Sequence, residues 1–288
     1  MSKVALTSPG LCAPRRQGLV ACRWLLARRA VQLGILGAFL LGPLAGLWLV
    51  KGNLSYSLTL DTLPLTDWFV LLQTFAAGQV PGRMALIGGL IVIVFYLLVG
   101  GRSYCAWVCP VNIVTDSAAW LRRRLDLRSG RAPAPGLRHA LLGVILGLNA
   151  LLGALVWEWV NPVSLLHRGL LFGFGLGWTV VAGIFLYDLF LAPRGWCGHL
   201  CPMGAAYGLL GRFALLRVSA QGRTRCDDCM DCYSVCPEPQ VIRPALKAQG
   251  NAGPVILASA CSNCGRCADV CHQNVFRFTT RFDTRSEP

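Results

Sequence analysis

Charged residues are scarce in this chain of 288 residues: they make up 14% of it, where soluble globular proteins have about 25%. Acidic residues are the scarcer sign, with 13 Asp and Glu against 27 Lys and Arg. Hydrophobic residues reach 55%, and the mean hydropathy is +0.54. This composition excludes an intrinsically disordered chain. It favours an integral membrane protein, because a large apolar surface with so little charge needs lipid as its solvent.

Several signals of common enzyme classes are also missing. The sequence contains no Gly-rich phosphate loop with a catalytic Lys, no GxSxG and no HExxH, which argues against nucleotide-driven and hydrolytic chemistry. The net charge of +14 would favour nucleic-acid binding in a soluble protein. In a membrane protein the positions of the basic residues are informative instead, and we expect no nucleic-acid partner.

Four apolar stretches are long enough to cross about 30 Å of hydrocarbon, at residues 30–50, 84–100, 140–160 and 170–192. Four spans place both termini on one side, and 24 of the 27 basic residues then lie on that side. The positive-inside rule makes this side cytoplasmic, with segments 51–83 and 161–168 facing outward. We therefore expect a basic cytoplasmic N-terminus (1–29), an all-α membrane domain of four transmembrane helices (30–217) and a small cytoplasmic domain (218–288).

The C-terminal domain contains two CxxCxxCxxxC sets, the spacing with which bacterial ferredoxins bind [4Fe–4S] clusters. A zinc site would show two pairs with a longer gap, and disulfides are disfavoured in a reducing cytoplasm. In the ferredoxin pattern the fourth cysteine of each set ligates the other cluster. We therefore predict a small α+β double-cluster ferredoxin domain. One cluster is expected on Cys226, Cys229, Cys232 and Cys271, and the other on Cys236, Cys261, Cys264 and Cys267.

Two further cysteine pairs lie in CAWVCP (Cys105, Cys109) and CGHLCP (Cys197, Cys201), directly after the second and fourth spans. On a helix, residues i and i+4 share one face, and the proline that follows stops or restarts the helix. The repetition at equivalent positions favours a redox or metal-ligating role over four inert buried side chains. It leaves open whether the four thiols form a dithiol couple or a further cluster site. Cys12 and Cys22 match no motif, and we expect them to be unpaired.

Four spans, the twin CxxxCP motifs and two cytoplasmic ferredoxin sets resemble the NapH family, ferredoxin-type membrane subunits of quinol dehydrogenases serving periplasmic nitrate reductase. Segments 61–67 (DTLPLTD), 157–165 (WEWVNPVSL) and 229–239 (CMDCYSVCPEP) are similar to that family in detail. The resemblance implies a multi-pass protein of the bacterial inner membrane that passes electrons from ubiquinol or menaquinol toward the reductase. It also implies a NapG-like periplasmic iron–sulfur protein and a NapC-type multihaem cytochrome as partners. The chain is then one component of a quinol dehydrogenase.

Glu158, at the outer end of the third predicted span, is a candidate proton acceptor for the quinol, and a helix cap or an interfacial side chain is the alternative. A second candidate function is a membrane polyferredoxin for maturation or regulation of a metalloreductase. Such relatives usually carry a large outward domain, whereas the outward segments here have 33 and eight residues. The electron-transfer subunit is therefore the preferred interpretation.

Overall fold

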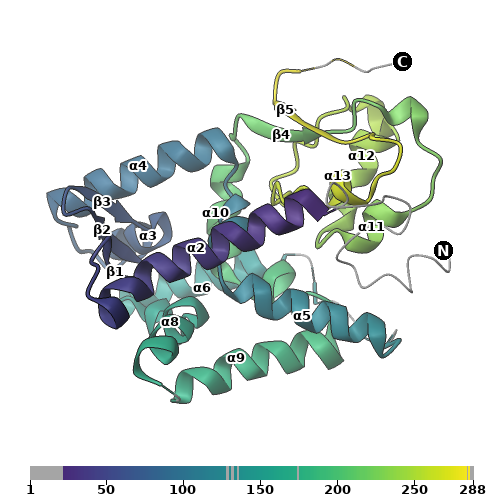
Figure 1. Ribbon diagram of the computed structural model, residues 1–288. Helices are drawn as coiled ribbons and strands as arrows, with labels where there is room; N and C mark the ends of the chain where they lie inside the picture. The colour runs from purple at the N-terminus through teal and green to yellow at the C-terminus, as the bar shows by residue number, and fades with distance from the viewer. Residues whose placement is uncertain are drawn as a thin grey trace.

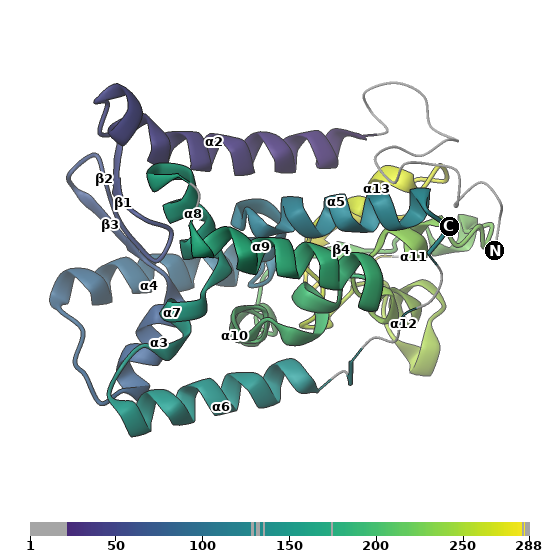
Figure 2. The ribbon, with the colours of Figure 1, turned by 90° about the horizontal axis from the view of Figure 1, so that it is seen from below.

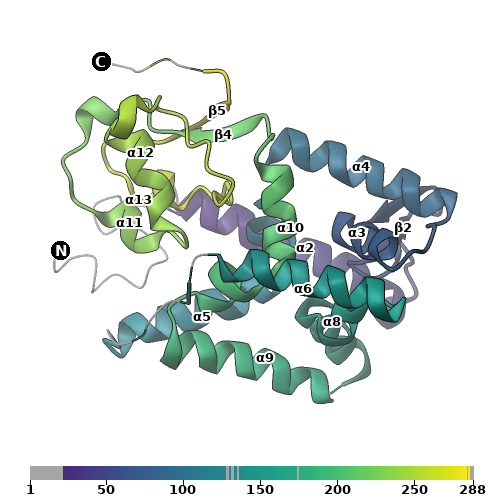
Figure 3. The ribbon, with the colours of Figure 1, turned by 180° about the vertical axis from the view of Figure 1, so that it is seen from behind.

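Four long helices form the body of the protein in the computed structural model, which describes residues 22–127, 130, 133, 134, 136–173, 175–283 and 285. They are α2 (Arg23–Ala45), α4 (Arg83–Val99), α6 (Leu137–Leu152) and α9 (Leu176–Leu186), the last extended by the π-helical turn η3 (Tyr187–Leu191). Figure 2 shows the four running in nearly the same direction, with successive helices alternating in sense. The C-terminal domain lies at one end of them (Figures 1 and 3).

The outer surfaces of these helices are apolar, with Leu33, Leu90, Val144 and Phe190 each more than half exposed. Among the described residues α2 alone is long and apolar enough to cross a membrane, while α4, α6 and residues Gly177–Leu191 are apolar but shorter. Four full-length spans, as predicted from the sequence, are therefore not confirmed.

The helix boundaries differ from the predicted spans for identifiable reasons. The third helix ends at Leu152 because Gly153 takes the left-handed conformation (φ 61°). The fourth predicted span is interrupted, since α8 (Pro162–Phe172) ends at Gly173 (φ 87°) before α9 begins. At the N-terminus α2 begins at Arg23, inside the segment predicted to precede the first span, and residues 1–21 of that segment lie outside the described residues.

A three-stranded antiparallel sheet lies at the end of the helices far from the C-terminal domain (Figure 2). Its strands are β1 (Val50–Gly52), β2 (Tyr56–Thr59) and β3 (Leu63–Thr66), paired in that order. The prediction of an all-α membrane domain is wrong here: the β-branched and aromatic residues of this short stretch fit a pleated sheet. Strand β3 packs closely on α4, because a Cβ at Gly88 would lie 2.9 Å from the Thr66 hydroxyl. Short helix α3 (Trp68–Ala76) follows and lies against α4 and α6.

At the opposite end α4 and α9 lead into matching turns. The π-helix η2 (Tyr104–Val108) precedes α5 (Val111–Arg124), and the π-helix η4 (Trp196–Leu200) precedes α10 (Pro202–Gly211). Helix α7 (Val156–Val160) connects α6 to α8 at the far end. Single π-helical turns frequently occur at functional sites, and here each contains the first cysteine of a CxxxC pair and ends at the second.

The C-terminal domain combines a two-stranded antiparallel sheet, β4 (Leu216–Ser219) with β5 (Arg277–Thr280), and the short helices α11 (Asp231–Val235), α12 (Ile242–Leu246) and α13 (Arg266–Val270). It has a hydrophobic cluster of its own, to which Val218, Ile242 and Phe276 contribute. Trp24 of α2 packs against this cluster, and the first turn of α2 donates two backbone hydrogen bonds to Asp269. The domain is thereby held against the helices.

Candidate iron–sulfur and electron-transfer site

The eight C-terminal cysteines divide into two groups around two separate small cavities. The first cavity is lined by Cys226, Cys229, Cys232 and Cys271. The second is lined by Cys236, Cys261, Cys264 and Cys267. These are the two groups that cross-ligation between the sets predicts, and we refer to them as the distal and the proximal group.

The two CxxCxxC loops repeat one backbone conformation. In each loop the residue before the second cysteine and the residue after it are left-handed: Asp228, Met230, Asn263 and Gly265. In each loop the first thiol accepts a hydrogen bond from the backbone N–H two residues later, from Asp228 and from Asn263. Four soft sulfur ligands with amide donors around one cavity fit a [4Fe–4S] cluster at each group.

His272 follows the last cysteine, where the first set has Pro237. The backbone at the two preceding cysteines is nevertheless alike, with φ −77° and ψ 107° at Cys271 and φ −73° and ψ 132° at Cys236. His272 therefore leaves the position of the fourth ligand unchanged, and its ring lies 3.1 Å from the Asp227 carboxylate.

The structure brings the two CxxxCP pairs together. Cys109 and Cys201 each end a π-helical turn, and each thiol accepts hydrogen bonds from backbone N–H groups in the first turn of the next helix. The Cys197 thiol donates to Thr115 of α5, the helix that follows the first pair, at 3.8 Å. Thiols of the two pairs also lie close enough to interact electrostatically. We refer to these four residues as the CxxxCP centre.

A buried ion pair connects the CxxxCP centre to the proximal group. Arg102 donates to Glu238 at 2.8 Å, to the Ala260 carbonyl at 2.8 Å and to the Cys197 carbonyl at 3.0 Å. Arg138 donates to the same Glu238 oxygen at 2.6 Å. The Cys197 backbone is thus joined through one guanidinium to the residue that precedes Cys261. Sequence reasoning missed these charged residues, because they follow no motif and come from three distant segments.

A second contact places the proximal loop directly on the end of α4. Asn263 donates to the Val99 carbonyl at 3.0 Å, and its own carbonyl accepts from the indole of Trp107 at 3.0 Å. Gly100 makes this approach possible, because it adopts φ 121° and a Cβ there would lie 2.4 Å from the Asn263 amide.

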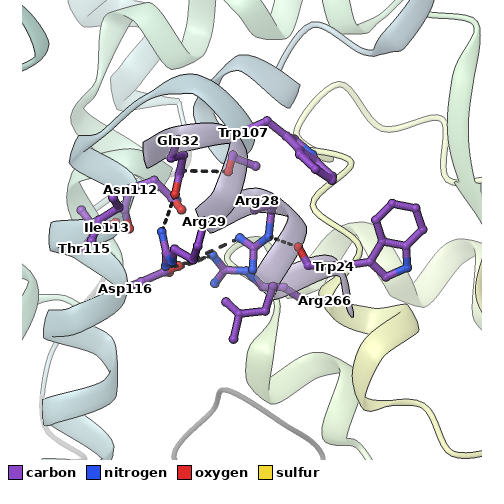
Figure 4. Close-up of polar contacts among 12 residues, drawn as sticks. Trp24, Arg28, Arg29, Gln32, Trp107, Asn112, Ile113, Thr115, Asp116 and Arg266 are labelled. Atoms are coloured by element: carbon purple, nitrogen blue, oxygen red, sulfur yellow. Dashed lines mark hydrogen bonds and ion pairs between the residues drawn. The ribbon is translucent and has the colours of Figure 1, made fainter. Parts of the chain in front are cut away.

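Several arginines lie near the proximal group. Figure 4 shows Arg28 and Arg29 of α2 and Arg266 of the C-terminal domain turned toward Asp116 of α5. Burial raises the pKa of the Cys264 thiol, but Arg266 and Arg28 outweigh this and hold that pKa below its ordinary value. The arginines thus favour the thiolate that a metal ligand requires.

Glu158 lies apart from both cysteine assemblies, which are the CxxxCP centre and the eight ferredoxin cysteines. Its carboxylate accepts hydrogen bonds from Ser55, Ser164 and Asn161, each at 3.0 Å, and joins the turn before β2 to α7 and α8. Its role as a proton acceptor stays a prediction, and these contacts are those of a structural carboxylate.

The expectation of an unpaired Cys22 is wrong, since this residue is disulfide-bonded. Cys12 lies outside the described residues.

Comparison with known proteins matches both cysteine assemblies. A family described as a 4Fe-4S binding domain matches residues 82–128 and 173–221, and a 4Fe-4S dicluster domain family matches residues 225–275. The cysteines within the two ranges of the first family are the four of the CxxxCP centre. Fold and comparison together define a ferredoxin-type iron–sulfur protein.

Relatives identify the family. The chain is 49% identical to the ferredoxin-type protein NapH of Haemophilus influenzae, over 93% of both chains, and 49% identical to NapH of Escherichia coli, over 91% of both. It is 51% identical to the methylamine utilization ferredoxin-type protein MauN of Paracoccus denitrificans, over 96% of this chain and 98% of the relative. No solved structure matches. The chain belongs to the NapH family, and it is equally similar to the MauN proteins.

Proposed function

We propose that this protein is a membrane electron-transfer subunit that takes electrons from a quinol and passes them through iron–sulfur centres toward periplasmic nitrate reductase. The observation that supports it most is the contact of Arg102, which joins the CxxxCP centre to the proximal group. Thiol-rich sites connected by buried hydrogen bonds are suited to moving electrons rather than to binding a partner alone.

The proposal includes four membrane crossings by α2, α4, α6 and α9, with both termini in the cytoplasm. Their alternating sense (Figure 2), their exposed apolar surfaces and the distribution of basic residues support this topology. Helices of 16 or 17 residues reach about 25 Å, so local thinning of the bilayer is expected around them. Reporter fusions after residues 83 and 288 test it, because they should report opposite compartments.

We further propose two [4Fe–4S] clusters on the distal and proximal groups and a third on the CxxxCP centre. The match of a 4Fe-4S binding domain to both halves of that centre supports a cluster over a dithiol couple. When bound, such clusters accept and release single electrons. The protein's own residues position them: the helix N-termini of α5 and α10 donate hydrogen bonds to Cys109 and Cys201, and Arg102 fixes the spacing to the proximal group.

A NapG-like periplasmic iron–sulfur protein and a NapC-type multihaem cytochrome are the proposed partners. The MauN relatives, which are as similar to this chain as the NapH relatives, are named for methylamine utilization. They support a second candidate destination for the electrons. Deletion of the gene in its host separates the two: nitrate-dependent growth fails if the first destination is right, and growth on methylamine fails if the second is. Quinol-dependent reduction of the purified protein tests the chemistry that both destinations share.

A further inference from the structure

A cavity with a volume of about 690 Å³ lies between α2, α4 and the β1–β3 sheet. Its size is that of sites that bind drug-sized organic molecules. We refer to it as the α2–α4 cavity. Most of its lining is aliphatic or aromatic, as at Ile35, Ala38 and Val92. Sequence reasoning gave no sign of it, because its walls come from separate segments.

One corner of the cavity is polar. Asp67, the N-cap of α3, is 5% exposed and uses one oxygen, Oδ1, for two hydrogen bonds: Phe69 N–H donates at 2.9 Å and the Tyr207 hydroxyl at 2.7 Å. Its other oxygen, Oδ2, is buried without a partner among the described residues, and so are the hydroxyls of Thr66 and Tyr104, which also line the cavity. Buried polar atoms without partners are costly, so three of them in one corner indicate a polar ligand there.

The same corner adjoins the CxxxCP centre. Tyr104 stacks on Tyr207 with ring centroids 4.5 Å apart, and both rings belong to a hydrophobic cluster against which Cys105, Cys109 and Cys201 pack. Tyr104 is also the residue directly before Cys105. A ligand in this corner would thus contact the same hydrophobic cluster against which these thiols pack.

We propose that the α2–α4 cavity is the quinol-binding site of this protein, with a quinol hydroxyl donating its hydrogen bond to Asp67 Oδ2. The proposal rests on the proposed function and assigns a place to its substrate. The Tyr104 and Thr66 hydroxyls supply further hydrogen bonds to the ring oxygens. Burial raises the pKa of Asp67 to about 7, against the hydrogen bonds that lower it. A carboxyl group that titrates near neutral pH suits a ligand that carries exchangeable protons.

The chemistry of the cavity favours a quinol over a phospholipid. A phosphate headgroup would be repelled by the Asp67 carboxylate and meets no Lys or Arg among the described residues that line the cavity, whereas a neutral phenolic ring matches the three oxygens. The rim includes Val31 and Phe95, which are 39% and 52% exposed on the outer surfaces of α2 and α4. In the proposed topology this rim faces lipid, so a quinol enters from the bilayer and leaves its isoprenoid tail there.

Two variants test the site in the full-length, cluster-loaded protein in lipid nanodiscs. Asp67→Asn removes the charge but keeps an N-cap for α3, and Ala38→Phe fills the cavity from α2. The matched controls are Asp61→Asn, an exposed carboxylate near the same sheet, and Ala30→Phe on the exposed side of α2. Binding of decylubiquinol, kept reduced by dithionite, is followed by tryptophan fluorescence, to which Trp107 in the cavity wall contributes.

We expect Asp67→Asn and Ala38→Phe each to weaken binding by at least about tenfold, with unchanged iron content and with both controls like wild type. Binding unchanged in both variants overturns the site. Binding lost in Ala38→Phe but kept in Asp67→Asn indicates an acyl chain in the cavity and overturns the role of Asp67. If Asp67→Asn loses its iron, the comparison of quinol binding by Ala38→Phe with that of its control Ala30→Phe decides whether the cavity is the site.

The same nanodisc preparation, mixed with decylubiquinol in the absence of dithionite, separates failure of this inference from failure of the proposed function. If quinol reduces the wild-type clusters while quinol binding is the same in the cavity variants as in wild type, only the proposed site is wrong. If wild-type protein neither binds quinol nor is reduced by it, the proposed function itself fails.

Discussion

Replacement of Arg102 by Met is the sharpest perturbation of the contact between the two cysteine assemblies. The guanidinium is 4% exposed and donates three hydrogen bonds, one to the equally buried Glu238 and two to the backbone carbonyls of Cys197 and Ala260. The charged hydrogen bond contributes about 1.5–3 kcal/mol, and each carbonyl left unpaired costs about 1 kcal/mol. The total is about 3.5–5 kcal/mol, which lies within the usual cost of breaking a buried ion pair.

A loss of this size weakens the docking of the C-terminal domain by about 2.5 to 3.5 orders of magnitude, since about 1.4 kcal/mol is tenfold. The domain keeps its own hydrophobic cluster, so both of its iron sites should stay loaded. Amide hydrogen exchange should rise in residues 258–263, and electron transfer from quinol should slow in stopped-flow traces. The control is Lys247→Met, which breaks an ion pair with Asp228 that is about half exposed and contributes little to stability. Unchanged hydrogen exchange and an unchanged rate of electron transfer in Arg102→Met would refute the role of Arg102 in joining the two cysteine assemblies.

Four further variants carry predictions. Cys109→Ser and Cys201→Ser should each lower iron by about four atoms per chain, as measured by chemical analysis, with the ferredoxin signals intact. Asp116→Asn should lower the Tm at pH 7, because four arginines, outweighing burial, hold the pKa of Asp116 well below its ordinary value. That stabilisation is present above the unfolded pKa of about 4 and is lost as pH falls toward the folded pKa, so the difference in Tm should shrink in acid. Gly100→Ala should push Asn263 aside and raise hydrogen exchange in the proximal loop, because a Cβ has no room there.

The cysteine spacing was informative because three of the four thiols in each ferredoxin group lie in one short loop, and the known pattern supplies the fourth. The division of the eight ferredoxin cysteines and the matching positions of the CxxxCP pairs follow from spacing alone, and the structure groups the thiols in the same way. The first two apolar stretches likewise correspond to helices α2 and α4 within a few residues, except at the start of α2.

The remaining features depend on tertiary contacts that spacing does not encode. Arg102 and Glu238 meet across 136 residues, and Asp67 meets Tyr207 across 140. The β1–β3 sheet was missed because its strands have three or four residues, too few to show alternation beside long apolar runs. Glu158 attracted attention as a carboxylate near a predicted span, whereas its three hydrogen bonds use it to join loops and helices.

The central claim is that electrons pass from quinol through the CxxxCP centre to the ferredoxin groups. Anaerobic, cluster-loaded protein mixed with decylubiquinol and frozen at successive times reports this directly by electron paramagnetic resonance. We predict that reduced-cluster signals appear in wild type and are absent in Cys109→Ser, while dithionite reduces the ferredoxin clusters of both. Wild-type clusters that dithionite reduces but quinol does not, or a Cys109→Ser variant reduced by quinol as fast as wild type, would contradict the account.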